Sequence, residues 1–299
     1  RSENAGVMHA CGHDAHAACL LGAAKILSEN RDAFSGKVRL VFQPGEEIGK
    51  GAKPFVAAGV LEGAERVFGL HTAYDLEAGT VGLKPGINNA AVDHFRIRVH
   101  GKSTHVSTPH LGVDALYIAS QIVVAVQGLV TRRTSPTEPV IIGIGKLNAG
   151  TTYNAVAAFA EMEGTTRTIS QESRDRVRAQ VSETAQSIAA LYGGTAEVEW
   201  TDFAAALVND PQVCEEAARV VDELLGAGHV VTDRELSLSG DNFAEFELYK
   251  PGAYAYLGTG NPDLPHTMIT NHNGGFDVDE NALVTGAGLY VGYTVARLG

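Results

Sequence analysis

Residues 7–27 read VMHACGHDAHAACLLGAAKIL, a stretch that joins two cysteines and three histidines to the start of an apolar helix. Cys11 and His13 lie two positions apart in a segment expected to be extended, so both side chains can point to one side. Thiolate and imidazole are ligands that suit zinc and its neighbours in the divalent series. Asp14 can cap a helix over 17–27, where apolar residues recur at helical spacing. The stretch predicts half of a metal site, with a buried thiol and an ordinary helix-start histidine as the alternative.

The composition is that of an ordinary globular protein, with 299 residues of which 44% are hydrophobic and 19% charged. This length allows two domains. A net charge of −12 without a basic run argues against nucleic acid as a partner. No stretch reaches the roughly 18 uninterrupted apolar residues of a membrane span. Three cysteines are an odd and sparse set for a disulfide framework, so we expect a reduced, cytoplasmic protein.

Helices alternate with short apolar segments in the first part of the chain. KVRLVFQ (37–43) lies between Gly36 and Pro44 and predicts a buried strand. A helix is expected over 52–58, and ERVFGLH (65–71) predicts a second strand. This alternation is typical of an α/β fold with a largely parallel sheet and functional loops at the strand ends. Later helices are expected over 210–226 and from Glu280 towards Leu298.

A different pattern covers residues 92–203. In DHFRIRVHG (93–101), Phe95, Ile97 and Val99 alternate with polar residues, as in a half-solvated strand. The elements expected next are a helix over 114–130, strands over 140–147 and 155–164, a helix over 172–191 and a strand over 196–203. This β-α-β-β-α-β order is the ferredoxin-like split motif. We therefore expect 92–203 to be an α+β domain inserted into a catalytic domain made of 1–91 and 204–299.

Two adjacent carboxylates, Glu46 and Glu47, follow the first predicted strand in QPGEEIGKG (43–51). Neighbouring side chains in a turn can take different tasks, one binding a cation and the other holding a proton beside it. A solvated acidic turn is the commoner role of such a pair. The position directly after an apolar strand favours the functional interpretation.

Two further histidines are candidate ligands. His71 ends the second predicted strand, and His272 precedes two glycines in TNHNGGFDVDE (270–280). Taken singly, each is more often a core, loop or capping residue. Taken with the earlier motifs, the candidates form a ligand set large enough for two metal ions: Cys11, His13, Glu47, His71 and His272. His9 and His16 remain outside this set and are expected to support the ligands or to face solvent.

Four motifs together resemble a known family: MHACGHDAH (8–16), FQPGEE (42–47), GLH (69–71) and GKSTHVSTPHLGVDAL (101–116). They are similar to those of the metal-dependent amidohydrolases of the aminoacylase/carboxypeptidase family, which includes hippurate hydrolases, N-acyl-amino-acid amidohydrolases and auxin-conjugate hydrolases. The resemblance runs in order across nearly the whole chain. It implies a zinc-exopeptidase-like catalytic domain with a mostly parallel sheet and an inserted ferredoxin-like lid and dimerisation domain.

The resemblance also implies roles for individual residues. The family's ligands for two divalent metals match Cys11, His13, Glu47, His71 and His272. Its catalytic base matches Glu46, and a lid histidine that reaches the reacting carbonyl, often across a dimer interface, matches His105. Asn154 and Arg167 match substrate-contacting lid residues, although Arg167 could also be a surface strand arginine.

The activity implied is hydrolysis of the amide bond of N-acyl-amino acids carrying acetyl, benzoyl or arylacyl groups. The implied cofactors are two divalent ions, with zinc, manganese, cobalt and nickel all acceptable to this ligand set. The implied partner is a second copy of the chain bound through the lid. An edge strand at 93–101 or 196–203 would offer unpaired backbone groups for that pairing.

The sequence departs from the family pattern at two places. Family members carry an earlier strand, rich in Arg, Asp and Met, before the CGHD motif. This sequence begins at Arg1 without it, so we expect a fragment or a trimmed chain. The late motif usually has a proline soon after its histidine, whereas this chain has Asn273, Gly274 and Gly275, with Phe276 and Asp277 still in register.

Three alternatives stay open. A dipeptidase or carboxypeptidase on the same scaffold would differ in accepting a free rather than a blocked amino terminus. A catalytically inactive metal-binding fragment is disfavoured by the presence of Glu46. A structural zinc protein is disfavoured because the candidate ligands are scattered and include glutamate instead of forming a cysteine quartet.

Overall fold

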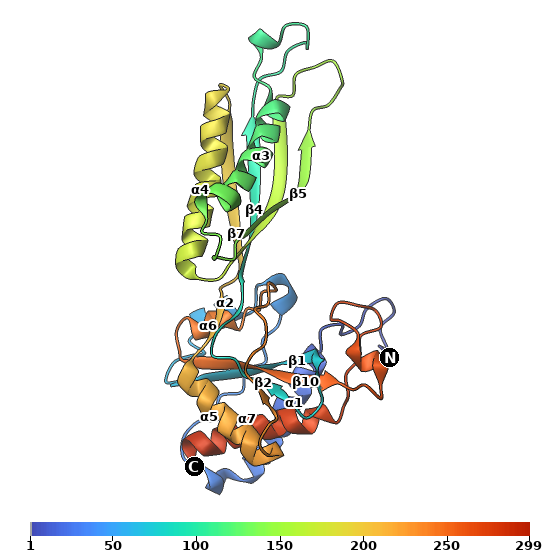
Figure 1. The fold of residues 1–299 in the computed structure, drawn as a ribbon, viewed down its shortest axis with the longest axis vertical. Helices are drawn as coiled ribbons and strands as arrows, with labels where there is room; N and C mark the ends of the chain where they lie inside the picture. The colour runs from blue at the N-terminus through green and yellow to red at the C-terminus, as the bar shows by residue number, and fades with distance from the viewer. Residues whose placement is uncertain (1) are drawn as a thin grey trace.

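The structure is a computed structural model that describes residues 2–299, and it shows two bodies stacked along one long axis (Figure 1). The lower body contains a four-stranded sheet in the order β1 (Val67–Glu77), β10 (Gly252–Gly260), β2 (Val81–Gly82) and β9 (Val230–Val231). β1 runs parallel to β10 and β2 parallel to β9, while β10 and β2 are antiparallel. The longest pair of strands in this sheet is therefore parallel, and the predicted α/β class is confirmed.

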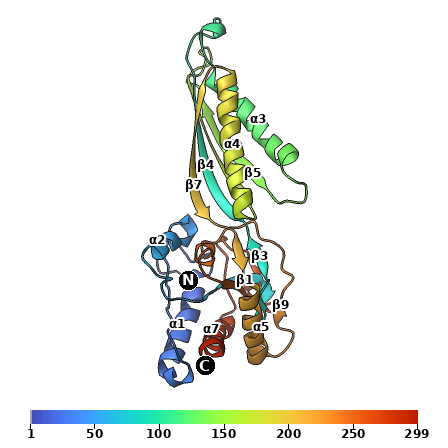
Figure 2. The same cartoon turned by 90° about the vertical axis from the view of Figure 1, so that its left-hand side faces the viewer.

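Three helices pack beneath this sheet: α1 (His13–Glu29), α5 (Pro211–Leu225) and α7 (Ala282–Leu298) (Figure 2). α7 lies against both other helices. A Cβ added at Gly286 would lie 2.5 Å from Cys19 Sγ, so the glycine is what allows α7 to approach α1 this closely. The apolar faces of the three helices and the sheet form one continuous core.

Helix α1 begins earlier than predicted, and its cap is different. Gly12 is the N-cap residue, with a left-handed φ of 76° that favours glycine. The Asp14 carboxylate only accepts from the neighbouring N–H of Ala15, at 3.0 Å, inside the first turn. The expected Asp14 cap is therefore wrong. A Cβ at Gly12 would lie 2.3 Å from Thr72 Oγ1, so this turn packs directly onto β1.

Residues 37–43 form no strand, contrary to the prediction. The alternating apolar side chains of Val38, Leu40 and Phe42 are 39%, 39% and 46% exposed. A strand must pair its backbone N–H and C=O groups with another strand. No strand within residues 2–299 pairs with this segment, so the side-chain pattern alone did not produce one.

The upper body is an antiparallel sheet in the order β5 (Ile141–Ala149), β6 (Phe159–Thr168), β4 (Ala91–His100) and β7 (Thr195–Ala204). Helices α3 (Ala115–Arg133) and α4 (Gln171–Leu191) cover one face (Figure 1). Phe95, Ile97 and Val99 are fully buried beneath them, as the alternation in 93–101 predicts. The ferredoxin-like order is confirmed. An edge strand was expected at 93–101 or at 196–203. The first segment lies in β4, which is an inner strand, whereas the second lies in β7, which is an edge strand.

The helices of the upper body are fixed at defined points. Asp114 caps α3 by accepting from the N–H groups of Leu116 and Tyr117. Arg174 of α4 donates to the buried carboxylate of Asp93 on β4 at 2.6 and 2.9 Å. Within residues 2–299, α3 alone is long and apolar enough to cross a membrane, but its buried residues belong to the core of the upper body.

Short elements join the two bodies and shape the loops. β3 (Gly86–Asn89) pairs with β8 (Leu207–Asn209) where the chain enters and leaves the upper body. The remaining helices are α2 (Ala52–Ala57), α6 (Ala244–Glu247) and the 3-10 turns η1 (Arg31–Ala33), η2 (Glu46–Ile48), η3 (Pro109–Leu111) and η4 (Pro265–Met268). α2 matches the expected helix, and β1 extends beyond the expected end at His71. β2, β3, β8, β9, β10 and α6 were not predicted.

Candidate metal centre

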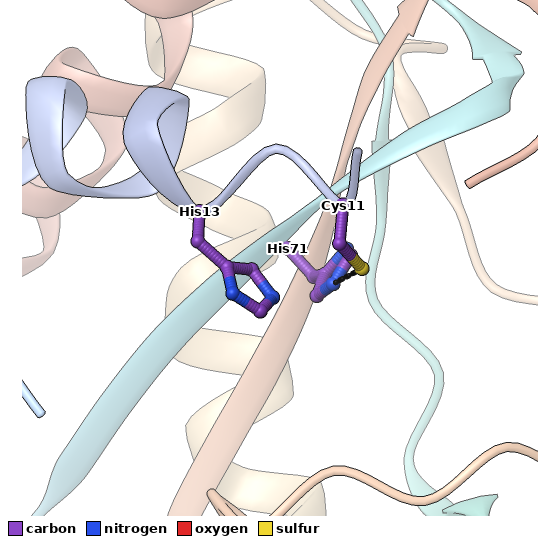
Figure 3. Close-up of side chains that lie close together, drawn as sticks. All are labelled: Cys11, His13 and His71. Carbon is purple, nitrogen blue, oxygen red and sulfur yellow. Dashed lines mark hydrogen bonds between the residues drawn. The ribbon is translucent and has the colours of Figure 1, made fainter. Parts of the chain in front are cut away.

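The structure brings all five predicted ligand residues into one cluster. Three overlapping groups have their candidate donor atoms within 4.8 Å of one another: Cys11, His13 and His71; Cys11, Glu47 and His272; and His13, Glu46 and Glu47. Figure 3 shows the first group, with Cys11 on the turn before α1, His13 at the first residue of α1, and both beside His71 on β1. The shared members make the groups one continuous set of sulfur, nitrogen and oxygen donors.

The donor atoms are spaced as metal ligands would be. Cys11 Sγ lies 3.5 Å from His71 Nε2, and Glu47 Oε1 lies 3.3 Å from His272 Nε2 and 4.0 Å from His13 Nε2. Ligands at about 2.0–2.3 Å from a tetrahedral zinc ion lie about 3.3–3.8 Å from each other. Glu47 sits between two of the histidines, and Cys11 faces both His71 and His272. The residues present therefore fit a pair of adjacent divalent ions.

His71 presents a defined nitrogen to the cluster. It is the fifth residue of β1 and not its last, which corrects the expected position at a strand end. Its Nδ1 lies 2.7 Å from the carbonyl oxygen of Thr72. Because a carbonyl can only accept, Nδ1 must carry the proton, and Nε2 keeps its lone pair towards Cys11.

Asn271 supports the cysteine from the late loop. Its Nδ2 donates to Cys11 Sγ at 3.4 Å. The next residue, His272, has a φ of 62° and is the one non-glycine residue with positive φ in residues 2–299. Such a conformation is strained, and strain of this kind collects at functional sites.

The cluster favours neutral forms of its thiol and histidine when no cation is present. Burial, followed by the charges of Glu47 and Glu46, raises the pKa of Cys11 to about 12, against a lowering contribution from Asn271. Burial and then the neighbouring His71 lower the pKa of His13. A bound divalent cation would reverse the preference at the cysteine by stabilising its thiolate, so binding would release a proton.

Glu46 differs from its neighbour in environment. Burial raises its pKa to about 8, and the carboxylates of Asp241 and Glu47 add to the effect, while the backbone N–H of Asn242 opposes it. Glu46 Oε2 lies 3.8 Å from His13 Nε2. This carboxyl group is thus poised to hold a proton at neutral pH beside the donor cluster.

Sequence reasoning missed Asp241, Asn242, Asn271 and Thr72. Asp241 accepts from the Tyr254 hydroxyl at 2.6 Å and from the N–H of Phe243 at 2.7 Å. Asn242 accepts from Gln43 Nε2 at 2.7 Å, which ties the loop before α6 to the turn that carries Glu46. For two of these residues the available signal was GDNF (240–243), where Asp241 and Asn242 come just before the short helix α6.

The three predicted lid residues do not join this cluster. His105 and Asn154 lie on neighbouring connections, where the N–H of Val106 donates to the Asn154 carbonyl at 3.1 Å. These connections, β4 to α3 and β5 to β6, are at the end of the upper sheet farthest from the lower body (Figure 1). Arg167 instead pairs with Val92 at the base of that sheet and donates to the Leu238 carbonyl at 2.8 Å.

The chain is similar to hydrolases of a known family over almost its whole length. The model of Peptidase family M20/M25/M40 matches residues 1–295. The chain is 40% identical to N-acetyl-L-cysteine deacetylase of Bacillus subtilis over 283 residues, covering 95% of this chain and 66% of that protein. It is 38% identical to thermostable carboxypeptidase 1 of Saccharolobus solfataricus over 290 residues, covering 96% of this chain and 72% of that protein.

A solved structure shares the fold. The crystal structure of a Bacillus subtilis protein described as a dinuclear metal binding peptidase from the M20 family superposes with a TM-score of 0.83 and 34% identity, covering 99% of this chain and 75% of that chain. The present chain thus spans about two thirds to three quarters of the length of the proteins it matches.

Proposed function

This chain belongs to Peptidase family M20/M25/M40, and on that premise we propose that it hydrolyses the amide bond of N-acyl-amino acids with two divalent metal ions. The observation that carries the proposal is the convergence of five donor residues beside the carboxyl group of Glu46, whose Oε2 lies 3.8 Å from His13 Nε2. The deacetylase relative supports an acyl-amino-acid substrate. The products would be a carboxylic acid and an amino acid.

The ions would be held by Cys11, His13, Glu47, His71 and His272. When bound there, they would act as Lewis acids that polarise the amide carbonyl and make a nearby water more acidic. Zinc, manganese, cobalt and nickel all suit this donor set. The Nδ1 proton of His71 and the Asn271 bond to Cys11 hold two of these ligands in orientation.

Glu46 moves the proton in this scheme. Divalent cations beside it would lower its pKa and favour the carboxylate. The carboxylate would then take a proton from the attacking water and pass it to the nitrogen of the leaving amine, which must leave as a neutral group. The N–H of Asn242 holds its carboxylate, and Gln43 holds the side chain of Asn242. Glu47 does not take part in proton transfer because its oxygen faces His13 and His272 as a ligand would.

The upper body would act as the lid and the dimerisation domain, with boundaries at 92 and 203. Arg167 lies at its base, where a guanidinium could hold the free carboxylate of the amino-acid part. His105 and Asn154 lie at its far end, so we propose that a partner subunit supplies them to this site in a homodimer. His105 would then stabilise the negative charge that develops on the carbonyl oxygen. We propose a reducing, cytoplasmic location, because three cysteines are an odd and sparse set for a disulfide framework.

A carboxypeptidase activity is the second candidate, favoured by the relative with that name. The test is a substrate screen with the purified chain loaded separately with zinc, manganese, cobalt and nickel. We expect acetyl-, benzoyl- or indoleacetyl-amino acids to be hydrolysed and dipeptides with a free amino terminus to be poor substrates. The reverse preference would establish the peptidase. Two bound ions without hydrolysis of either class would identify an inactive metal-binding fragment.

A further inference from the structure

His16 is the histidine of the CGHDAH motif that the metal centre leaves unused. Its ring lies against the rings of two proposed ligands, with centroids 5.3 Å from His13 and 4.4 Å from His71. Yet His16 belongs to none of the groups of candidate donor atoms in residues 2–299. Its nitrogen Nε2 points instead to the backbone of β1, 2.9 Å from the N–H of Thr72.

The direction of this hydrogen bond is fixed by chemistry. A backbone N–H can only donate, so His16 Nε2 must accept and cannot carry a proton. The same residue of β1 offers its carbonyl oxygen to His71 Nδ1, at 2.7 Å. Thr72 therefore contacts two histidines through its backbone. The His16 ring accepts a hydrogen bond from its N–H, and the His71 ring donates one to its C=O.

The position of Thr72 in the sheet explains why its backbone groups form hydrogen bonds with histidine side chains. β1 is an outer strand of its sheet, and outer strands leave backbone groups without a neighbouring strand. Thr72 is nevertheless buried, at 2% exposure, so its N–H and C=O need partners from elsewhere. Both are provided by imidazole rings.

We propose that His16 is a positioning residue that acts through Thr72 to hold His71 in its Nδ1–H tautomer. By accepting from the N–H, His16 fixes this part of β1, and the Thr72 carbonyl then keeps the proton of His71 away from Nε2. Only the unprotonated Nε2 can bind a cation. The inference rests on the proposed role of His71 as a ligand.

Thr72 also contacts the turn that carries the other ligands. Its hydroxyl donates to the Cys11 carbonyl at 3.5 Å, and its side chain fills the space where a Cβ of Gly12 would lie. A shift of Thr72 would therefore disturb both His71 and the turn holding Cys11. Through Thr72, His16 therefore supports the positions of both His71 and Cys11.

The test compares variants that separate hydrogen bonding from ring volume. His16→Gln places an amide oxygen near the position of Nε2 and retains an acceptor, whereas His16→Phe retains an aromatic ring without one. His16→Leu is a variant smaller than phenylalanine and without an acceptor, to be used if the phenylalanine prevents folding. The first readout is the tautomer of His71 in the metal-free protein, from long-range proton–nitrogen NMR correlations. The second is zinc affinity by competition with a chelator.

We expect wild type and His16→Gln to show the His71 proton on Nδ1 and to bind zinc with similar affinity. His16→Phe or His16→Leu should show mixed tautomers and bind zinc roughly 10–100-fold more weakly, the usual range for loss of a group that orients a ligand. An acceptor-free variant that keeps both the tautomer and the zinc affinity would overturn the proposal, even if its melting temperature fell. The NMR readout needs neither metal nor substrate, so it can fail or succeed independently of the proposed hydrolysis.

Discussion

The backbone N–H of His272 donates to the carbonyl of Ala10 across 2.7 Å. This bond joins the late loop to the turn directly before Cys11, so ligands from opposite ends of the chain are held together by main-chain atoms. His272, which makes this hydrogen bond, also has the strained φ of 62°. Strain of this kind costs roughly 1–3 kcal/mol and persists only where the surroundings impose it. Main-chain contacts between distant segments therefore help to place the ligands of this centre.

The first prediction concerns this pair of segments. Replacing Cys11 or His272 with alanine should lower the amount of bound metal and abolish amide hydrolysis, because each removes a donor from the group that also contains Glu47. Elemental analysis of the purified variants gives the metal content. His266→Ala is the matched control, since this exposed histidine of the same loop faces Asp277 and should leave the metal content unchanged. Full occupancy in either ligand variant would remove that residue from the centre.

The second prediction separates the two adjacent glutamates. Glu46→Gln should retain metal and substrate binding but lose roughly 10²–10⁴-fold in kcat, the usual contribution of a positioned acid or base. Glu47→Gln should instead lose metal, because Glu47 Oε1 faces His13 and His272. Metal content and steady-state kinetics of the two variants are measured side by side. Near wild-type turnover in Glu46→Gln would show that another group transfers the proton.

The ligands of this centre could be predicted because each lies in a short motif of uncommon residue types. The residues that hold them could not. Thr72, Asn271 and Asp241 are ordinary in sequence, and their roles come from contacts between segments far apart in the chain. Their positions in the fold, and not their local patterns, give them these functions.

The upper body was easier to predict than the lower one. Phe95, Ile97 and Val99 alternate cleanly because one face of β4 is buried and the other is not. The lower sheet lacks that signal. β10 is buried on almost every residue and is built from small and aromatic side chains, so it shows no alternation. In contrast, 37–43 has a strand-like pattern but no partner strand in residues 2–299.

The third prediction is a pH dependence of folding away from the metal centre. Burial raises the pKa of Glu247 to about 8, although the N–H of Val208 donates to its Oε2 at 3.0 Å. The folded state thus keeps a proton that the unfolded chain releases near the ordinary glutamate pKa of 4.5. The free energy of unfolding should fall as pH rises from about 4.5 to about 8, and this contribution should be constant above that range.

Urea unfolding of the metal-free protein across this range tests the effect. Glu247→Gln cannot titrate and should show a flatter dependence on pH, with the exposed Glu223→Gln as the matched control. Equal slopes for Glu247→Gln and wild type would show that Glu247 is ionised in the folded protein at neutral pH. Because Glu247 is not one of the candidate donors, the result does not depend on the metal.

The last prediction concerns the lid. β4 has ten residues and therefore spans about 30 Å at roughly 3.3 Å per residue, and it separates His105 from the body that holds Glu46. A lid anchored at its base cannot easily bring its own far end to that site, whereas a second copy could do so by pairing along the outer strand β7. We expect a dimer in light scattering. His105→Ala should reduce turnover strongly without changing metal content, and His110→Ala, on the same connection, should have little effect.

Mixing the two inactive variants, His105→Ala and Glu46→Gln, shows whether a site receives His105 from its own subunit or from the partner subunit. In a cross-subunit arrangement, one site of each mixed dimer regains Glu46 from one chain and His105 from the other, so partial activity should return. The second site of that dimer lacks both groups and stays inactive, which limits recovery to about half of wild type per mixed dimer. Absence of recovery in verified mixed dimers would show that each lid serves its own site. A monomer at working concentration would exclude the dimer itself and leave lid closure as the only route for His105.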